Sequence, residues 1–140
     1  MPEAYCYPHP RPAVTVDIVL LSSDGAVLLV RRNAEPFQGR WALPGGFVEM
    51  DERLAEAAAR ELQEETGVGG VALRELGVFD DPGRDPRGRT ISIAFVGRVA
   101  GRPALRSGTD AAAASWRALD DLPALAFDHD QIVRSALETT

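Results

Sequence analysis

The sequence lacks the features of secreted and membrane proteins. Its single cysteine, Cys6, cannot form a disulfide bond within the chain, so nothing in it indicates an oxidising compartment. The first twelve residues contain no apolar run that could act as a signal peptide. The longest apolar runs elsewhere fall far short of a membrane span. We therefore expect a cytoplasmic protein with no membrane partner.

The sequence also has little positive charge. It contains 15 basic and 21 acidic side chains, for a net charge of -6 and an isoelectric point near 4.9. A surface that binds nucleic acid is usually basic, so this balance argues against a nucleic-acid partner. The 140 residues, 45% of them hydrophobic, are typical of one globular domain. We expect a single domain over residues 1–140, in which residues 1–12 form an irregular, proline-rich arm.

Apolar, β-branched runs separated by turn residues predict several strands. Residues 13–32 contain two such runs on either side of Asp24-Gly25, which is typical of a β-hairpin. Further strands are predicted at 41–49, where Pro44-Gly45-Gly46 interrupts the strand, at 71–80 and at 89–101. Residues 108–123 are expected to form a polar loop.

Two helices complete the predicted fold. The first runs from about residue 52 to residue 66 and ends at Gly67, which suits the left-handed position after a helix. The second runs from about residue 129 to residue 137, with Asp128 as its N-cap and Gln131 in the capping-box position. The order of elements fits an α/β fold in which a mixed sheet is covered by helices on both faces.

The first helix carries its acidic residues at the unfavourable end. Glu61, Glu64 and Glu65 lie in the last turn, where the helix dipole is negative, at a cost of about 0.3–1 kcal/mol per anion. Small residues one turn above them, Ala57 and Ala58, are expected to leave this face open. The adjoining apolar stripe is expected to comprise Ala55, Ala58, Ala59 and Leu62. Three converging carboxylates are typical of a hard-oxygen site for Mg²⁺ or Mn²⁺, and the alternative is a solvated acidic face.

A longer motif surrounds these glutamates. The pattern G-x5-E-x7-R-E-U-x-E-E-x-G-U, in which U is aliphatic, is matched at all nine specified positions by Gly46, Glu52, Arg60-Glu61-Leu62, Glu64-Glu65 and Gly67-Val68. This pattern is the Nudix box, and the chain resembles the Nudix hydrolases from the first hairpin to the C-terminal helix. The resemblance implies an α/β/α sandwich and a metal-dependent enzyme that cleaves a nucleoside diphosphate linked to another group.

The resemblance also implies roles for individual residues. The implied metal ligands are Glu61, Glu64, Glu65 and the Gly45 carbonyl group. One of these glutamates, most often the one that matches Glu61, acts as general base in the family, and we count Glu61 and Glu65 as catalytic. Glu52 would orient the acidic cluster and Arg60 would brace its carboxylates. The alternative for Arg60 is an ordinary surface ion pair, worth about 0.3–0.5 kcal/mol.

Many family members contribute one more carboxylate from a later loop. Asp110, six residues before Trp116, is the best candidate for this further metal ligand. Relatives often have a glutamate closer to that tryptophan, where this chain has Ala113. An ordinary loop aspartate is therefore the alternative for Asp110.

The segments 36–49 and 79–95 resemble the ADP-ribose pyrophosphatase branch of the family. In that branch a proline lies about fifteen residues beyond the box, as Pro82 does. The substrate-binding residues expected from these segments are Phe37, Trp41, Arg84, Arg87 and Arg89. The arginines would bind phosphate and the rings would stack on a base. The alternatives are a solvated turn for the arginines and a core position for Trp41, while both histidines are expected to be structural or exposed.

The resemblance leaves two other functions open. A MutT-type enzyme, which hydrolyses a (d)NTP or 8-oxo-dGTP, has the same box. In some regulators of NAD metabolism a Nudix-like domain binds ADP-ribose and a second domain binds DNA. We expect no second domain here, and the intact box favours an enzyme. Dimers are common in the family, so a homodimer is an expected assembly, with the N-terminal arm lying across the partner.

Overall fold

The fold begins with a hairpin whose first strand is buried on both faces. In β1 (Ala13–Ser22), every residue from Thr15 onward is buried. Such continuous burial is typical of a strand covered on each side. The turn to β2 (Ala26–Arg32) has Gly25 at φ +87°, a left-handed conformation that glycine adopts without a steric penalty. The predicted hairpin is confirmed.

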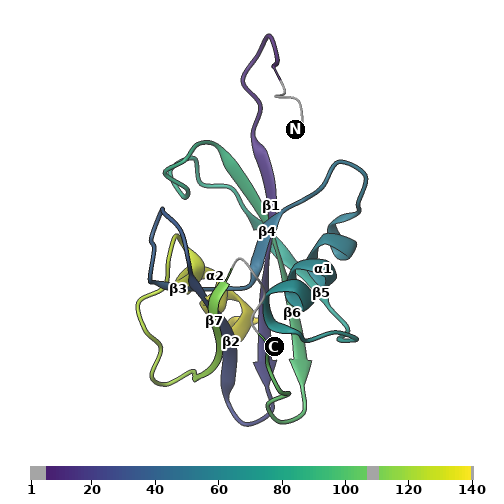
Figure 1. The fold of residues 1–140 in the computed structure, drawn as a ribbon, viewed down its shortest axis with the longest axis vertical. Helices are drawn as coiled ribbons and strands as arrows, with labels where there is room; N and C mark the ends of the chain where they lie inside the picture. The colour runs from purple at the N-terminus through teal and green to yellow at the C-terminus, as the bar shows by residue number, and fades with distance from the viewer. Residues whose placement is uncertain (1–5, 107–110, 140) are drawn as a thin grey trace.

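The computed structural model describes residues 6–106 and 111–139. After the hairpin, the chain forms β3 (Trp41–Ala42), β4 (Gly45–Phe47), α1 (Leu54–Thr66), β5 (Arg74–Phe79), β6 (Thr90–Val99), β7 (Ala111–Ala118) and α2 (His129–Glu138). The described part of the N-terminal arm extends away from the sheet beyond the start of β1 (Figure 1). No helix in the described ranges is long and apolar enough to cross a membrane.

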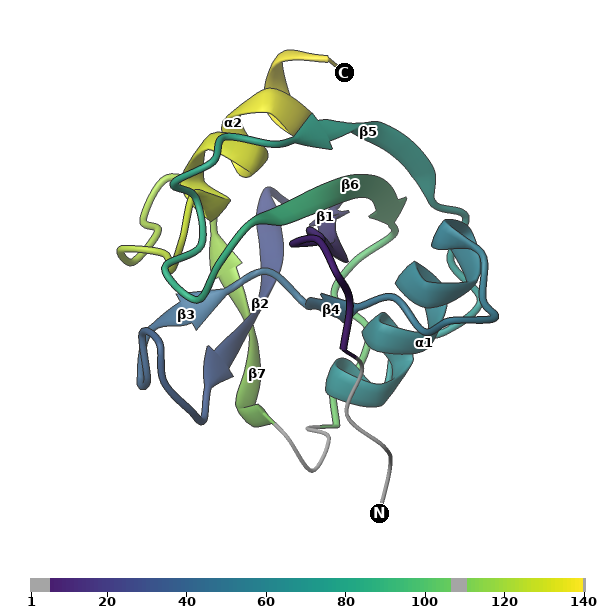
Figure 2. The ribbon, with the colours of Figure 1, turned by 90° about the horizontal axis from the view of Figure 1, so that it is seen from above.

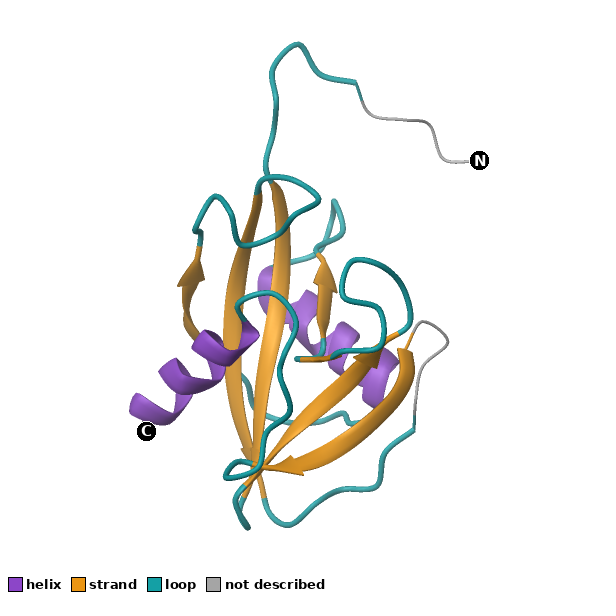
Figure 3. Ribbon diagram, turned by 90° about the vertical axis from the view of Figure 1, so that its left-hand side faces the viewer, coloured by secondary structure: helices purple, strands orange, loops and turns teal. Residues whose placement is uncertain are grey.

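The sheet is mixed and forks beyond the hairpin turn. Its main order is β3-β2-β1-β6-β5, with β4 paired to β1 and β7 paired to β2. β1 and β6 run parallel along their whole length, and the other pairs are antiparallel. β1 and β2 pair beside the turn, at Leu21 and Val27, and then diverge so that each takes other partners. Figure 3 shows the strands converging at one end of the molecule and spreading apart toward the other.

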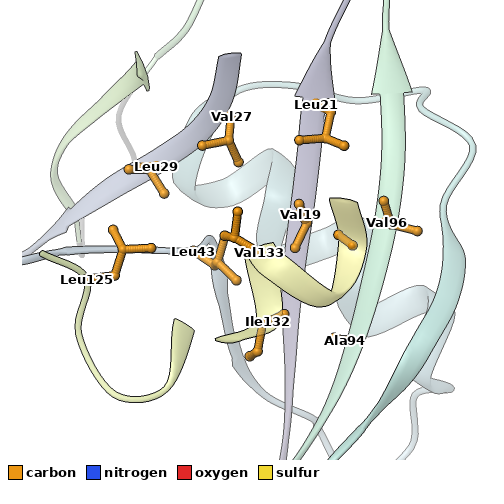
Figure 4. Packing of buried hydrophobic residues seen from close by; sticks show 11 residues of the cluster. Val19, Leu21, Val27, Leu29, Leu43, Ala94, Val96, Leu125, Ile132 and Val133 are labelled. Atoms are coloured by element: carbon orange, nitrogen blue, oxygen red, sulfur yellow. The ribbon is translucent and has the colours of Figure 1, made fainter. Parts of the chain in front are cut away.

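The two helices cover opposite faces of the sheet (Figure 2). Successive side chains of a strand point to opposite faces. On β1, the even-numbered residues from Val16 to Leu20 pack on the α1 side, whereas Val19 and Leu21 pack on the α2 side. Figure 4 shows the core on the α2 side, where Ile132 contributes from the helix. The predicted α/β/α sandwich with a mixed sheet is confirmed.

The prediction of a loop at 108–123 was wrong. Ala111–Ala118 forms β7, which pairs antiparallel with β2 along nearly its whole length. Alanine is depleted in strands, so the four consecutive alanines at 111–114 concealed this one. Residues 111–118 form a strand because they pair with the buried strand β2, and no pattern in their own sequence predicts that pairing.

The predicted packing face of α1 was right for Ala58 and Leu62 and wrong for its other residues, and the helix begins at Leu54, two residues later than expected. Its buried side chains are Ala57, Ala58, Leu62 and Thr66. Ala57 and Ala58 therefore fill the core and do not open the acidic face. Ala55 and Ala59, which were expected in the apolar stripe, are exposed because the buried stripe is rotated around the helix from the predicted one.

Candidate active site in the forked sheet

A cleft of about 810 Å³ lies where β1 and β2 diverge. Its lining comes from β1, β2, β4, the second half of α1, the 80–89 loop and the start of α2. This volume is typical of a site for a small molecule. Glutamates of α1 line one wall, and arginines from β2 and the 80–89 loop line another.

The glycine pair that opens β4 allows α1 to approach the sheet closely. A Cβ atom on Gly46 would lie 2.7 Å from the carboxylate carbon of Glu61. A Cβ atom on Gly45 would lie 2.1 Å from the carbonyl oxygen of Val16. Both distances are clashes, so any larger residue would push the strand away from the helix or from β1. Glycine at these two positions brings the acidic wall against the sheet.

Glu61 and Glu65 form a close carboxyl pair in this wall. Glu65 accepts a hydrogen bond from the Gly45 backbone N–H at 3.0 Å. Burial, with smaller contributions from the neighbouring Glu61 and Asp17, raises the pKa of Glu65 to about 8 against the opposing effect of the Gly45 hydrogen bond. Burial also raises the pKa of Glu61, although Arg60 opposes the shift. The two side chains share a hydrogen bond.

Arg60 donates hydrogen bonds to the carboxylates of three glutamates. It donates two hydrogen bonds to Glu52, at 2.6 and 2.9 Å, one to Glu61 at 2.8 Å and one to Glu64 at 3.2 Å. The hydrogen bonds from Arg60 lower the pKa of Glu52 to about 2. Glu56, one turn before Arg60, instead accepts the Arg53 N–H at 2.8 Å and caps the start of α1. The network around Arg60 is therefore more extensive than a single surface ion pair.

The donor atoms on this wall suit a hard divalent cation. Carboxylate oxygens are the preferred ligands of Mg²⁺ and Mn²⁺, and the raised pKa values of Glu61 and Glu65 indicate carboxyl groups without enough compensating positive charge. Within the described part of the chain, no three such side chains already converge on one point. Arg60 instead engages Glu61 and Glu64. Asp110, the predicted additional ligand, lies outside the described residues.

The arginines of the 80–89 loop differ in their surroundings. Arg84 is buried and makes two hydrogen bonds to Asp128, at 2.9 and 2.7 Å. This burial contradicts the solvated turn suggested for Arg84, whereas its role in substrate binding stays a prediction, because Arg84 also lines the cleft. Arg87 pairs with Asp85 at 2.8 Å, yet it keeps 42% of its side chain exposed and lines the cleft. Arg89 lies outside the lining and donates to the Asp80 carbonyl oxygen at 2.5 Å.

The Arg84 pairing also explains why Asp128, which is the N-cap residue of α2 as predicted, does not cap the helix with its side chain. Asp128 is the N-cap residue, but its side chain makes no capping hydrogen bond, because the carboxylate faces Arg84. No local sequence pattern reports this contact, since 44 residues separate the partners.

The predicted aromatic residues lie outside the cleft lining. Trp41 packs against the hydrophobic core on the α2 side, which matches the alternative reading of that residue. Phe37 packs edge-to-face against Phe127, with ring centroids 4.9 Å apart. The aromatic rings that do line the cleft are Phe47 and Phe127. The sequence reasoning missed both.

Arg32, at the end of β2, was also missed. Its guanidinium lies 4.9 Å from the centre of the Phe127 ring and donates to the Pro36 carbonyl oxygen at 2.7 Å. No carboxylate among the described residues lies within ion-pair distance of it. Burial and the nearby Arg87 lower its pKa. The signal available in the sequence was the pair of arginines that ends an apolar strand.

Comparisons with known proteins agree with this geometry. Residues 11–136 match the NUDIX domain family. The chain is 47% identical over 124 residues to a Methanocaldococcus jannaschii protein named ADP-ribose pyrophosphatase, a match that covers 89% of this chain and 72% of that protein. It is 31% identical to an ADPR responsive transcriptional repressor of Acinetobacter baylyi, over 91% of this chain and only 54% of the repressor.

Two solved structures show the same fold. The NUDIX domain of Shewanella oneidensis NrtR complexed with ADP ribose gives a TM-score of 0.86 at 32% identity, covering 94% of this chain and 90% of that domain. A bifunctional NMN adenylyltransferase/ADP ribose pyrophosphatase from Francisella tularensis, complexed with AMP and a Mn ion, gives 0.83 at 33% identity. That match covers 95% of this chain and 43% of the Francisella chain. The chain described here belongs to the Nudix hydrolase family.

Proposed function

We propose that this enzyme hydrolyses ADP-ribose to AMP and ribose 5-phosphate with the help of Mg²⁺ or Mn²⁺. The observation that carries the proposal is the two-walled cleft, with Nudix-box carboxylates on one side and arginines beside aromatic rings on the other. Such a cleft can hold the reacting diphosphate through a cation on one side and the rest of the nucleotide on the other. The likeness to a protein named ADP-ribose pyrophosphatase supports this choice of substrate.

The cation would be held by the carboxylates of α1. The proposed ligands are Glu61, Glu64, Glu65 and the Gly45 carbonyl group, with Asp110 as a further candidate. A bound Mg²⁺ or Mn²⁺ would neutralise the negative charge of the phosphate oxygens and lower the pKa of the attacking water. Arg60 contacts one oxygen of Glu61 and one of Glu64, so each keeps a second oxygen for another partner. Glu52 would act on the site indirectly, because it accepts two hydrogen bonds from the Arg60 guanidinium and so holds it in place.

The proton released by the attacking water would pass to the Glu61–Glu65 pair. A general base works best when its pKa lies near the operating pH. Burial raises the pKa of both carboxyl groups, and that of Glu65 reaches about 8. Either glutamate can thus serve as the immediate acceptor.

The opposite wall would bind the nucleotide. Arg87 lies 5.2 Å from the ring centre of Phe47 and 5.6 Å from that of Phe127, so a cation stands beside two rings. Arg32 adds a cation without a carboxylate partner. Arg84 and Arg87 already pair with aspartates, which leaves limited positive charge for phosphates. This balance suits a diphosphate better than the more highly charged triphosphate of a MutT-type substrate.

The substrate assignment is tested by comparing kcat/KM for ADP-ribose, NADH, GTP and 8-oxo-dGTP at one Mg²⁺ concentration, with the products identified. The ratio of two such values reports differential binding of the transition states. We expect ADP-ribose to give the highest value, with AMP and ribose 5-phosphate as products. If 8-oxo-dGTP is preferred by tenfold, or about 1.4 kcal/mol, the MutT-type alternative replaces this assignment.

An ADP-ribose sensor is the alternative that involves no catalysis. The similarity to a transcriptional repressor and to an ADP-ribose-bound regulator domain motivates it. The complete Nudix box argues for turnover instead, because a sensor needs no metal-binding carboxylates. Tight binding of ADP-ribose without release of AMP in the presence of Mg²⁺ would favour the sensor.

A further inference from the structure

A largely buried polar network lines the cleft near the start of α2. Its centre is Asp17 on β1, whose carboxylate accepts a hydrogen bond from the Ser92 hydroxyl. The same carboxylate lies 3.3 Å from Nε2 of His129 and 3.7 Å from the Arg84 guanidinium. All four side chains are buried, and His129 is only 4% exposed. The network therefore links β1, β6, the 80–89 loop and α2 in the interior.

His129 has a defined tautomer in this network. The Leu43 backbone N–H donates to Nδ1 of His129 at 3.0 Å. A ring nitrogen that accepts a hydrogen bond carries no proton, so neutral His129 carries its proton on Nε2. That N–H faces the Asp17 carboxylate. His129 thus connects the Leu43 backbone to Asp17 through both of its ring nitrogens.

Leu43 is followed by the glycine segment of the acidic wall. The Pro44 carbonyl oxygen accepts from the Ile18 N–H at 2.9 Å, which ties the segment to β1. The Gly45 N–H then donates to Glu65. His129 holds the start of this segment from the α2 side, and Glu65 contacts its end. The sequence of contacts runs from Asp17 through His129 and residues 43–45 to the carboxylate of Glu65.

We propose that His129, oriented by Asp17, is a positioning residue that holds Leu43 in place and thereby sets Gly45 and Glu65 for cation binding. The inference rests on the metal role proposed above for Gly45 and Glu65. His129 acts through the backbone of Leu43 and does not serve as a ligand. Removal of a residue that orients a metal ligand without itself contacting the metal typically weakens metal affinity by about 10–100-fold.

Two conservative variants separate the contacts of His129. In H129N the amide oxygen lies near the position of Nδ1 and can still accept from Leu43. In H129Q the amide group lies near the position of Nε2, so Leu43 loses its acceptor. The Mn²⁺ dissociation constant of the metal-free protein, without substrate, can be measured from the electron paramagnetic resonance signal of free Mn²⁺. We expect H129Q to bind Mn²⁺ about tenfold more weakly than wild type or worse, and H129N to lie closer to wild type.

The matched control is I132V, which loosens the packing of α2 without altering a polar contact, since Ile132 is fully buried in the apolar core. It should lower Tm and leave the Mn²⁺ dissociation constant unchanged. A loss of affinity in H129Q no larger than in I132V overturns the proposal, and so does an equal loss in H129N and H129Q. If wild type itself fails to bind Mn²⁺, the metal role fails as well, which distinguishes the two outcomes.

A measurement on the unmutated protein tests the same idea independently of how the variants fold. Long-range ¹H–¹⁵N spectra distinguish the two neutral tautomers of histidine. We expect His129 to show the Nε2–H form. The Nδ1–H form would overturn the proposal, because Nδ1 could not then accept the Leu43 hydrogen bond.

Discussion

Replacement of Glu65 by glutamine tests whether the acidic wall carries uncompensated charge without metal. Burial, with contributions from Glu61 and Asp17, raises the pKa of Glu65 to about 8. Glutamine has nearly the same shape, and its side-chain oxygen can still accept the Gly45 N–H. The substitution therefore removes the ionisable group and leaves the packing largely intact.

The raised pKa makes the stability of the metal-free protein depend on pH. The folded state holds the Glu65 proton more tightly than the unfolded state, whose value is near 4.5. The associated stability is present below pH 4.5 and is lost as the pH rises through about 8. At about 1.4 kcal/mol per pKa unit, the difference gives an upper bound of roughly 5 kcal/mol, and we expect a few kcal/mol.

The assay is urea unfolding of the metal-free protein at pH 5 and pH 8. Wild type should lose a few kcal/mol of unfolding free energy over this interval, whereas E65Q should lose much less and exceed wild type at pH 8. Added Mg²⁺ should stabilise wild type more than E65Q, because binding to the folded state shifts the equilibrium. E64Q is the matched control for the pH dependence of the metal-free protein, since the Glu64 side chain is 60% exposed. An equal pH dependence in wild type and E65Q would refute the reasoning.

Five substitutions test other parts of the structure. Glu64→Gln should lower kcat for ADP-ribose by about 10²–10³-fold with the fold retained, and near wild-type kcat at saturating Mg²⁺ would contradict its assignment as a ligand. Arg60→Lys should also lower kcat and raise the Mg²⁺ concentration needed for half-maximal activity, since one ammonium group cannot replace a planar guanidinium that donates to three carboxylates. An unchanged dependence of activity on Mg²⁺ would exclude the bracing role. Arg84→Ala should lower the unfolding free energy by about 3–5 kcal/mol in urea melts, because Asp128, whose side chain is only 13% exposed, loses its charge pair. Arg89→Ala, at an exposed position, is the control and should change the unfolding free energy by less than about 0.5 kcal/mol. Arg32→Ala should raise KM for ADP-ribose with little change in kcat, and an unchanged KM would remove Arg32 from the binding wall.

The sequence was informative wherever the determinant is local. The Asp24-Gly25 turn, the end of α1 at Gly67 and the sandwich of helices around a mixed sheet follow from periodicity, turn residues and the Nudix box. The box also brings its glutamates together, because positions three and four residues apart share a face of a helix. Arg60 was expected to brace them and does contact them.

The features that escaped sequence reasoning depend on contacts between distant segments. Strand β7 consists largely of alanine, and its conformation is decided by pairing with β2. Arg84 is buried and pairs with Asp128, and no spacing rule in the sequence connects these two residues. Arg32 and Phe127 enter the cleft only because the sheet forks between β1 and β2. In each case the fold brings together residues whose neighbours in the sequence give no sign of the contact.

The central claim, that the Nudix glutamates and a divalent cation hydrolyse ADP-ribose in this cleft, is tested most directly by measuring AMP release from ADP-ribose as a function of Mg²⁺. We expect no release in EDTA, a rate that rises to saturation with Mg²⁺, and equal amounts of AMP and ribose 5-phosphate. Undiminished hydrolysis in EDTA would contradict the metal mechanism. ADP-ribose that remains intact at saturating Mg²⁺, although it binds to the protein, would contradict the claim that this protein turns it over.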